Sequence, residues 1–179
     1  GQDRDDLFLL TMTGDGGGQI IRQLNTDTAN YSYPAISPDG TKVVVVREVL
    51  EGDNVGVDLV IIDVASGTPT SLTTDRNATI ETMPRWDSAS SLVVYSARPE
   101  GTQANEIYFI DIRNPDSGQI RINAPDSDEI MPTFSPDGRY LAYSSNRTGD
   151  YQIYVQNLSS NEVFQLTFID DENILGDWR

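Results

Sequence analysis

Apolar and polar residues alternate in short runs along the chain, most clearly between Met131 and Leu158. With the apolar run that follows, this pattern predicts four short strands, which are Met131–Phe134, Arg139–Ser145, Tyr151–Leu158 and Phe164–Thr167. A Ser-Pro-Asp-Gly segment joins the first two, where Pro136 fixes φ and Gly138 supplies a positive φ. The pattern is therefore that of an antiparallel meander with tight turns.

The element that opens this meander recurs along the chain. Its copies are Tyr33–Gly40, Met83–Ser90, Met131–Gly138 and the shorter Leu175–Trp178. The matching residues Ile36, Trp86, Phe134 and Trp178 are 50, 48 and 44 residues apart. A period near 45 residues is typical of a propeller blade of four strands.

The other strands of the repeat recur at the same period. Second strands are predicted at Lys42–Arg47, Ser91–Ser96 and Tyr140–Ser145. Third strands are predicted at Leu7–Met12, Leu59–Val64, Ile107–Ile112 and Ile153–Leu158, and fourth strands at Gln19–Leu24, Thr70–Thr73, Gln119–Asn123 and Phe164–Thr167. The continuous apolar run Val43–Val46 indicates a strand packed on both faces. No sustained helical period is found.

The sequence thus predicts an all-β fold, a β-propeller of four-stranded antiparallel blades with three full repeats and partial blade strands at both ends. We expect one propeller or propeller fragment over residues 1–179, with repeats at about 1–29 (partial), 30–78, 79–126, 127–171 and 172–179. A ring of four blades would be the smallest common propeller. The count therefore favours part of a larger propeller, or an assembly that completes the ring between chains, over a closed ring.

The motifs also carry a family resemblance. Pro-x-(Trp/Phe/Ile)-Ser-Pro-Asp-Gly, then Tyr-Leu-Ala-Tyr-Ser-Ser-Asn-Arg, Ile-Tyr-Val and Gln-Leu-Thr, resembles the TolB-type, WD-like propeller repeat, most faithfully in Pro132–Thr167. The resemblance runs from about Leu7 to Trp178. In the middle copy Asp87-Ser88-Ala89-Ser90 replaces Ser-Pro-Asp-Gly, and the first full copy carries a longer insertion, Val49–Val57.

Charge and composition narrow the class of partner. The 12 basic and 28 acidic residues give a net charge of −16, so the chain has no basic stripe for a phosphate backbone and nucleic acid is not expected. No apolar run approaches the roughly 20 residues of a membrane span, and no signal-peptide pattern is present. Because the sequence has no Cys, cysteine usage does not indicate whether the protein works in a reducing or an oxidising compartment.

Catalytic systems that depend on His or Cys are excluded within this sequence, whereas its many carboxylates leave an acid–base pair open. It contains no His and no Cys, which excludes Ser-His-Asp and Cys-His nucleophile systems and the usual zinc sites. We therefore expect no enzyme activity from this chain. Asp39 and Asp137 of the Ser-Pro-Asp-Gly segments are interpreted as turn residues that accept backbone N–H groups.

Acidic residues precede each first strand and are the candidate site. Glu81 and Glu129 each lie three residues before the Pro of the repeat, and Asp170-Asp171-Glu172 leads into the last copy. In a propeller, the loops before the innermost strands open near the central channel. Glu81, Glu129 and Glu172 could hold a hard cation such as calcium there; the alternative is that they are solvated or cap the strands. No other cofactor is predicted.

Function is predicted from the resemblance alone. It implies a non-catalytic protein-binding or scaffolding module similar to the TolB cell-envelope propeller, in the periplasm or outside the cell. One alternative is the propeller (gating) domain of a prolyl-oligopeptidase-like serine hydrolase whose catalytic part lies outside this chain. Others are a self-assembling structural module, in which incomplete blades pair between chains, and a carbohydrate-active propeller that uses paired carboxylates.

Overall fold

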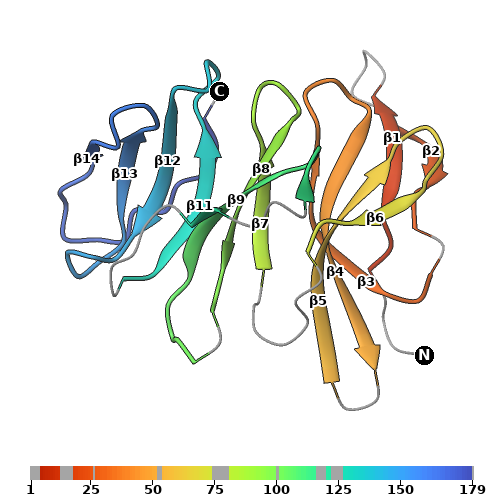
Figure 1. Ribbon diagram of the computed structural model, residues 1–179, viewed down its shortest axis with the longest axis horizontal. Coiled ribbons are helices and arrows are strands. Elements are labelled where there is room, and N and C mark those ends of the chain that lie inside the picture. The colour runs from red at the N-terminus through yellow and green to blue at the C-terminus, as the bar shows by residue number, and fades with distance from the viewer. Residues whose placement is uncertain are drawn as a thin grey trace.

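The computed structural model describes residues 5–12, 18–25, 27–51, 54–73, 81–99, 101–115, 120–121 and 127–178. Its regular elements are β-strands, which form one two-stranded and three four-stranded antiparallel sheets (Figure 1). In each four-stranded sheet the strands lie in chain order from first to fourth. We call these sheets the N-terminal hairpin and the first, second and third blades.

The strand bounds follow the predicted repeat. The N-terminal hairpin contains β1 (Phe8–Met12) and β2 (Gly18–Gln23). The first blade contains β3 (Asn30–Ile36), β4 (Lys42–Glu51), β5 (Asn54–Asp63) and β6 (Pro69–Ser71). The second blade contains β7 (Glu81–Trp86), β8 (Leu92–Ala97), β9 (Glu106–Asp111) and β10 (Ile120–Arg121), and the third β11 (Glu129–Phe134), β12 (Tyr140–Ser145), β13 (Gln152–Asn157) and β14 (Val163–Gln165).

The insertion Val49–Val57 lies between the second and third strands of the first blade, as expected, and it lengthens both, because β4 and β5 stay paired as far as Glu51 and Asn54 in a long hairpin. One expectation about the strands was wrong. The predicted first strand at Leu175–Trp178 is not formed as a strand. Its N–H at Leu175 instead donates to Ser144 Oγ at 2.8 Å. A first strand is defined by pairing with a second strand, and the described chain offers none at this place.

Each first strand contains the same irregularity. Tyr33, Met83 and Met131 have φ values of 52°, 54° and 55°, and each directly precedes a proline. The strand register shifts at these positions in all three blades. A proline inside a strand has no N–H for the ladder and is tolerated at a bulge. The repeated Pro therefore marks a bulge that bends the innermost strand.

The core lies between successive sheets and not within one layer. Val43 and Val45 pack in one cluster with Leu7 and Leu24 of the N-terminal hairpin. The alternate residues Val44 and Val46 pack with Trp86, Val93 and Tyr95 of the second blade. A third cluster joins the second and third blades through Val94, Ile107, Leu141 and Tyr143. The prediction that Val43–Val46 is buried on both faces is confirmed.

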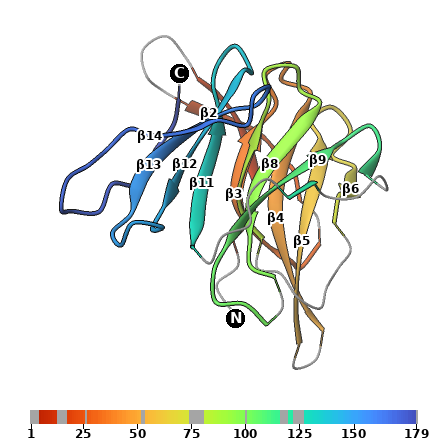
Figure 2. The same cartoon turned by 60° about the vertical axis from the view of Figure 1, so that its left-hand side comes forward.

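The blades follow one another around their first strands. β7 contacts both β3 and β11, so the innermost strands of the three blades are neighbours. The third blade and the N-terminal hairpin lie at opposite ends of the arrangement in Figure 1, and Figure 2 shows the sheets turned relative to one another. The described sheets therefore form an open arc with two end faces.

Candidate functional site

A hollow of about 440 Å³ lies where the ends of β3, β7 and β11 meet the last described residues of the chain. Four repeats contribute the same two positions to its lining. The first of these positions, which we call the inner position, directly follows the Pro or Gly of the repeat and is occupied by Ala35, Arg85, Thr133 and Asp177. The position after it is occupied by Ile36, Trp86, Phe134 and Trp178. The hollow is thus a direct product of the repeat.

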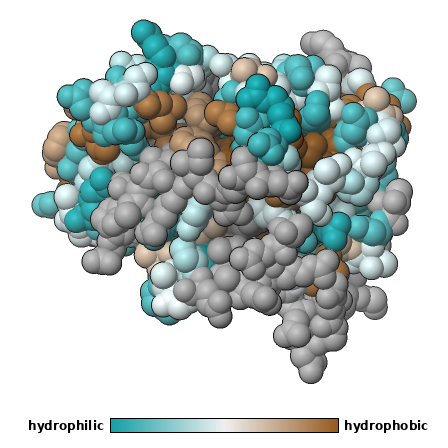
Figure 3. Space-filling view, in the orientation of Figure 1, coloured by the Kyte–Doolittle hydropathy of each residue, from teal (hydrophilic) through white to brown (hydrophobic). Residues whose placement is uncertain are grey.

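The apolar positions of the hollow are held by packing between blades. Trp86 and Phe134 are buried, and the Phe134 ring stacks on Phe109 of the second blade with centroids 5.4 Å apart. Trp86 Nε1 donates to the carbonyl of Ala35 at 2.9 Å. Ile36 is 56% exposed, so the hollow presents an open apolar side chain. Apolar side chains, in brown, also gather across the upper part of the molecule in the view of Figure 3.

The inner positions give the hollow its polar character. Arg85 is half-buried, and its Nη1 donates to the carbonyl of Pro84 at 3.0 Å. Asp177 is exposed and accepts the N–H of Trp178 at 3.0 Å. Arg85 is the one basic side chain among the described residues that line the hollow. A carboxylate of a bound segment could therefore pair with Arg85 beside an apolar wall.

Tight turns form part of the rim. In the first blade, Asp39 Oδ1 accepts the N–H of Thr41 at 2.9 Å and the hydroxyl of Ser37 at 2.6 Å. Ser135 and Arg139 bind Asp137 in the same way in the third blade. Led by the serine hydroxyl bond, these hydrogen bonds lower the pKa of both carboxyls to about 2. The prediction that Asp39 and Asp137 are turn residues is confirmed.

The divergent middle copy keeps the same turn with different residues. Asp87 Oδ1 accepts the N–H of Leu92 at 2.8 Å, the role that the serine hydroxyls have toward Lys42 and Tyr140 in the other blades. Ser90 has a φ of 57°, close to the 70° and 68° of Gly40 and Gly138. In the second blade, Asp87 therefore accepts the hydrogen bond of the turn, and Ser90 adopts the left-handed backbone conformation that glycine has in the other two blades.

The three glutamates predicted to lie near the central channel, Glu81, Glu129 and Glu172, differ in their surroundings. Glu129 is fully buried at the start of β11, and Glu172 is exposed. Glu81 begins β7, but its side chain lies outside the described residues. The N–H of Glu129 donates to Asn105, and the corresponding bond in the tail runs from Asn173 to Tyr151. Asn173, and not Glu172, therefore matches Glu129 in register.

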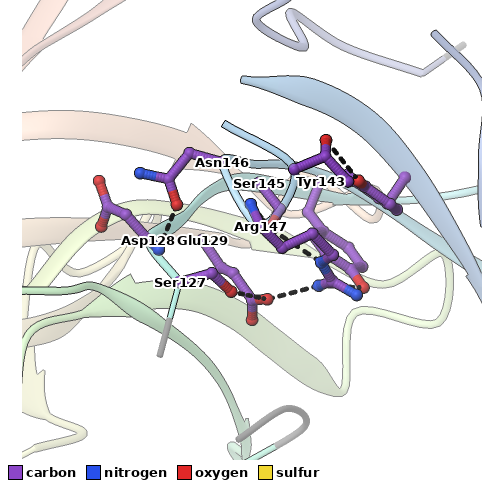
Figure 4. A network of polar contacts seen from close by, with 9 residues as sticks. Ser127, Asp128, Glu129, Tyr143, Ser145, Asn146 and Arg147 are labelled. Carbon is purple, nitrogen blue, oxygen red and sulfur yellow. Dashed lines mark hydrogen bonds and ion pairs between the residues drawn. The ribbon is translucent and has the colours of Figure 1, made fainter. Parts of the chain in front are cut away.

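Glu129 belongs to a polar network at the start of β11 (Figure 4). Arg147 Nη2 lies 2.5 Å from Glu129 Oε1, and the Ser127 hydroxyl donates to the same oxygen at 3.2 Å. The Arg147 guanidinium also lies 4.4 Å from the centre of the Tyr154 ring. Burial raises the pKa of the Glu129 carboxyl, and the charge of Arg147 opposes this shift.

This network serves the contact between the second and third blades, because Tyr143, which accepts from Arg147, belongs to their shared cluster. No group of three or more acidic residues is placed to hold a metal ion within the described ranges. Since the Glu81 side chain is not among them, calcium binding by Glu81, Glu129 and Glu172 stays a prediction.

Sequence reasoning missed the polar side chains of the hollow. Arg85 and Asp177 stand one residue after the Pro84 and Gly176 positions of their repeats. The signal was therefore present as equal spacing in the four copies. It was overlooked because the residue types at this position differ from copy to copy.

The fold agrees with known structures. The chain is similar to TolB from Acinetobacter baumannii, with a TM-score of 0.72 and 22% identity over 95% of this chain and 40% of that one. It is also similar to the β-propeller domain of the Trilobed protease from Pyrococcus furiosus, with a TM-score of 0.59 and 17% identity over 78% of this chain and 43% of that domain.

In sequence, the chain is 25% identical to the uncharacterized protein Atu1656 of Agrobacterium fabrum, over 96% of this chain and 54% of that protein. No protein-family model matches the chain. The chain thus spans about half the length of this relative. Within the described residues, no helix has the length and hydropathy that crossing a bilayer requires. The fold is therefore that of part of a TolB-like β-propeller, and the sheets of the described residues do not close into a ring.

Proposed function

We propose that this chain is a non-catalytic protein-binding module, located in the periplasm or outside the cell, that binds a segment of a protein partner in the hollow. The observation that supports it most is the lining, in which four repeats place an Ala, an Arg, a Thr and an Asp at one position. A fold-defining position would favour one residue type, whereas this position varies between copies. Such variation suits recognition of an asymmetric ligand.

The chemistry of the hollow favours a peptide segment over a small reactive substrate. Ile36 and Trp86 offer apolar contact, Arg85 offers a guanidinium for a carboxylate, and Asp177 offers an acceptor. The sequence has no His or Cys, so the usual nucleophile–base pairs cannot be built from this chain. We therefore place the function in binding.

Site-specific photo-crosslinking tests this proposal. A photoreactive amino acid in place of Ile36 puts the probe in the hollow, and the same residue in place of Thr70 on β6, also exposed, is the matched control. In extracts of the source cells we expect a discrete protein adduct from position 36 alone. Arg85→Glu in the same chain should abolish it while the circular dichroism spectrum stays unchanged.

Equal adducts from positions 36 and 70, or an adduct that survives Arg85→Glu, would contradict binding in the hollow. A second candidate function would be supported by a different result, in which the crosslink depends on the hollow but the full-length protein also cleaves the crosslinked partner. That candidate is a gating domain of a serine hydrolase, favoured by the similarity to the propeller domain of a protease. It requires a nucleophile and a His elsewhere in the same protein.

A further inference from the structure

One position of the innermost strands carries a large side chain on a strained backbone. Tyr33, Met83 and Met131 occupy it, with φ values of 52°, 54° and 55°. This left-handed region costs free energy for any residue with a Cβ, and the proline that follows each of the three restricts the backbone further. Glycine would suit this backbone better, yet all three blades have a large side chain here.

Core packing does not account for these side chains. None of the three is a member of the hydrophobic clusters that join the described blades. Tyr33 is 45% exposed, and Met83 and Met131 are half-buried. Met83 lies on β7, which contacts an innermost strand on either side, β3 and β11. Backbone strain that core packing does not offset is concentrated at functional sites in proteins.

These residues lie beside the hollow. Each stands two residues before the inner position of its strand, where Ala35, Arg85 and Thr133 line the hollow. Two residues of a strand span at most about 7 Å. A segment that is bound at Arg85 therefore reaches Met83 with a side chain one or two residues away.

The two places offer different chemistry to a ligand. Arg85 is the one basic side chain among the described residues that line the hollow, and a guanidinium binds a carboxylate through paired hydrogen bonds. Methionine is unbranched and polarizable, so Met83 and Met131 adapt to apolar groups of different shapes. Tyr33 adds an aromatic ring with a polar tip. Together they suit a ligand with a carboxylate and a large apolar group close to each other.

We propose that Tyr33, Met83 and Met131, which we call the bulge residues, bind a large apolar side chain of the partner segment, while Arg85 binds an aspartate or glutamate within two residues of it. The assignment rests on the proposed function, because it names the class of segment that the hollow takes. The formal charge of −16 repels a segment with many carboxylates. A single acidic residue next to the apolar one is therefore the favoured composition.

Selection from a random library of short peptides displayed on phage tests this class of segment, with the immobilised chain as bait. We expect the enriched peptides to share a large apolar residue and an acidic residue no more than two positions apart. Arg85→Gln should remove the acidic preference, and Met83→Gln combined with Met131→Gln should remove the apolar one. Enriched peptides without this pair, or no enrichment over the empty support, would overturn the inference.

A synthetic peptide with the enriched pair, measured by fluorescence anisotropy, tests the apolar contact directly. Met83→Gln combined with Met131→Gln should raise its Kd about tenfold. The Kd of a peptide with alanine at the apolar position should not change. Equal losses for the two peptides would overturn the contact, because they would show that the substitutions act through the fold. Asn161→Gly, at an exposed left-handed position between β13 and β14, is the matched control and should affect neither peptide.

Thermal unfolding separates a role in binding from a role in folding. Met83→Gly removes the side chain and relieves the left-handed strain. Its unfolding midpoint should therefore stay the same or rise, while its affinity for the peptide falls. A lower midpoint would overturn the proposal, since it would show that the Met83 side chain stabilises the fold.

The photo-crosslink from position 36 distinguishes failure of this inference from failure of the proposed function. A crosslink that requires Arg85 but survives Met83→Gln combined with Met131→Gln would keep the hollow as the binding site and would overturn only the role of the bulge residues. Absence of the crosslink from the unsubstituted hollow would contradict the proposed function itself.

Discussion

Trp86 and Ala35 occupy neighbouring positions of successive repeats, and the indole Nε1 of Trp86 donates to the carbonyl oxygen of Ala35 across 2.9 Å. Both residues line the hollow. The bond thus joins the first and second blades at the place where the candidate site is formed, so the stability of the arc and the shape of the site are linked.

Trp86→Phe should lower the free energy of unfolding by about 1–2 kcal/mol, since it removes this bond and part of a buried ring. Denaturant titration followed by circular dichroism measures the change. Trp178→Phe is the matched control, because Trp178 also lines the hollow and its ring packs beside Tyr140, but it takes no part in the bond to Ala35. Equal losses in the two variants would contradict the role of the Trp86 bond.

Gly138→Ala should destabilise the protein by about 1 kcal/mol, because an L side chain at a φ of 68° is strained even where space is free. A Cβ at Gly138 would meet its nearest atom, Ser88 Oγ, at 3.7 Å, so no clash adds to the cost. Gly176→Ala, where the backbone is not left-handed and no atom lies within 4 Å, should be neutral in the same thermal scan.

Arg147→Met should cost about 3–5 kcal/mol, since it leaves the buried Glu129 carboxylate without its guanidinium. Adding Glu129→Gln to this variant should restore part of the loss. A double-mutant cycle by urea unfolding measures the coupling. If the two effects simply add, Arg147 and Glu129 are not energetically coupled, which would contradict the stabilising role of the ion pair.

The Glu129 carboxyl should also give a pH dependence of stability. Its pKa in the folded protein lies above the ordinary 4.5, because of burial. The folded state therefore binds more protons in the window above 4.5, and this group's contribution to stability falls as pH rises through that window. The fall should be absent from Glu129→Gln. Unfolding titrations at a series of pH values compare the two slopes.

The turn aspartates should act in the opposite direction. Their serine hydroxyl and backbone N–H bonds lower the folded pKa of Asp39 and Asp137 from 3.8 to about 2. Their stabilisation is complete above 3.8 and is lost as pH falls toward 2. Asp137→Asn should make acid unfolding less steep, whereas Asp170→Asn, at an exposed site in the tail, should leave it unchanged. Identical acid curves for all three proteins would refute this assignment.

Local patterns in the sequence were enough for the strands and turns. Alternation placed β11 to β14 within a few residues of their bounds, and the Pro136–Gly138 chemistry predicted the turn that Asp137 closes. These features depend on side-chain period and on φ preferences, which are properties of a few adjacent residues. The equal spacing of the copies then gave the order of the blades.

Contacts between side chains of different repeats could not be predicted from local sequence patterns. Arg85 and Asp177 meet at one hollow, and Arg147 pairs with Glu129, because of how whole sheets pack and twist around one another. The tail did not form the expected strand, since a strand requires a partner that local pattern does not supply. The sequence by itself determined each blade, through short-range preferences. The tertiary structure alone decided which sheet covers each face, as Val43 and Val44 show by packing in the clusters of the N-terminal hairpin and of the second blade, because burial depends on the neighbouring sheet.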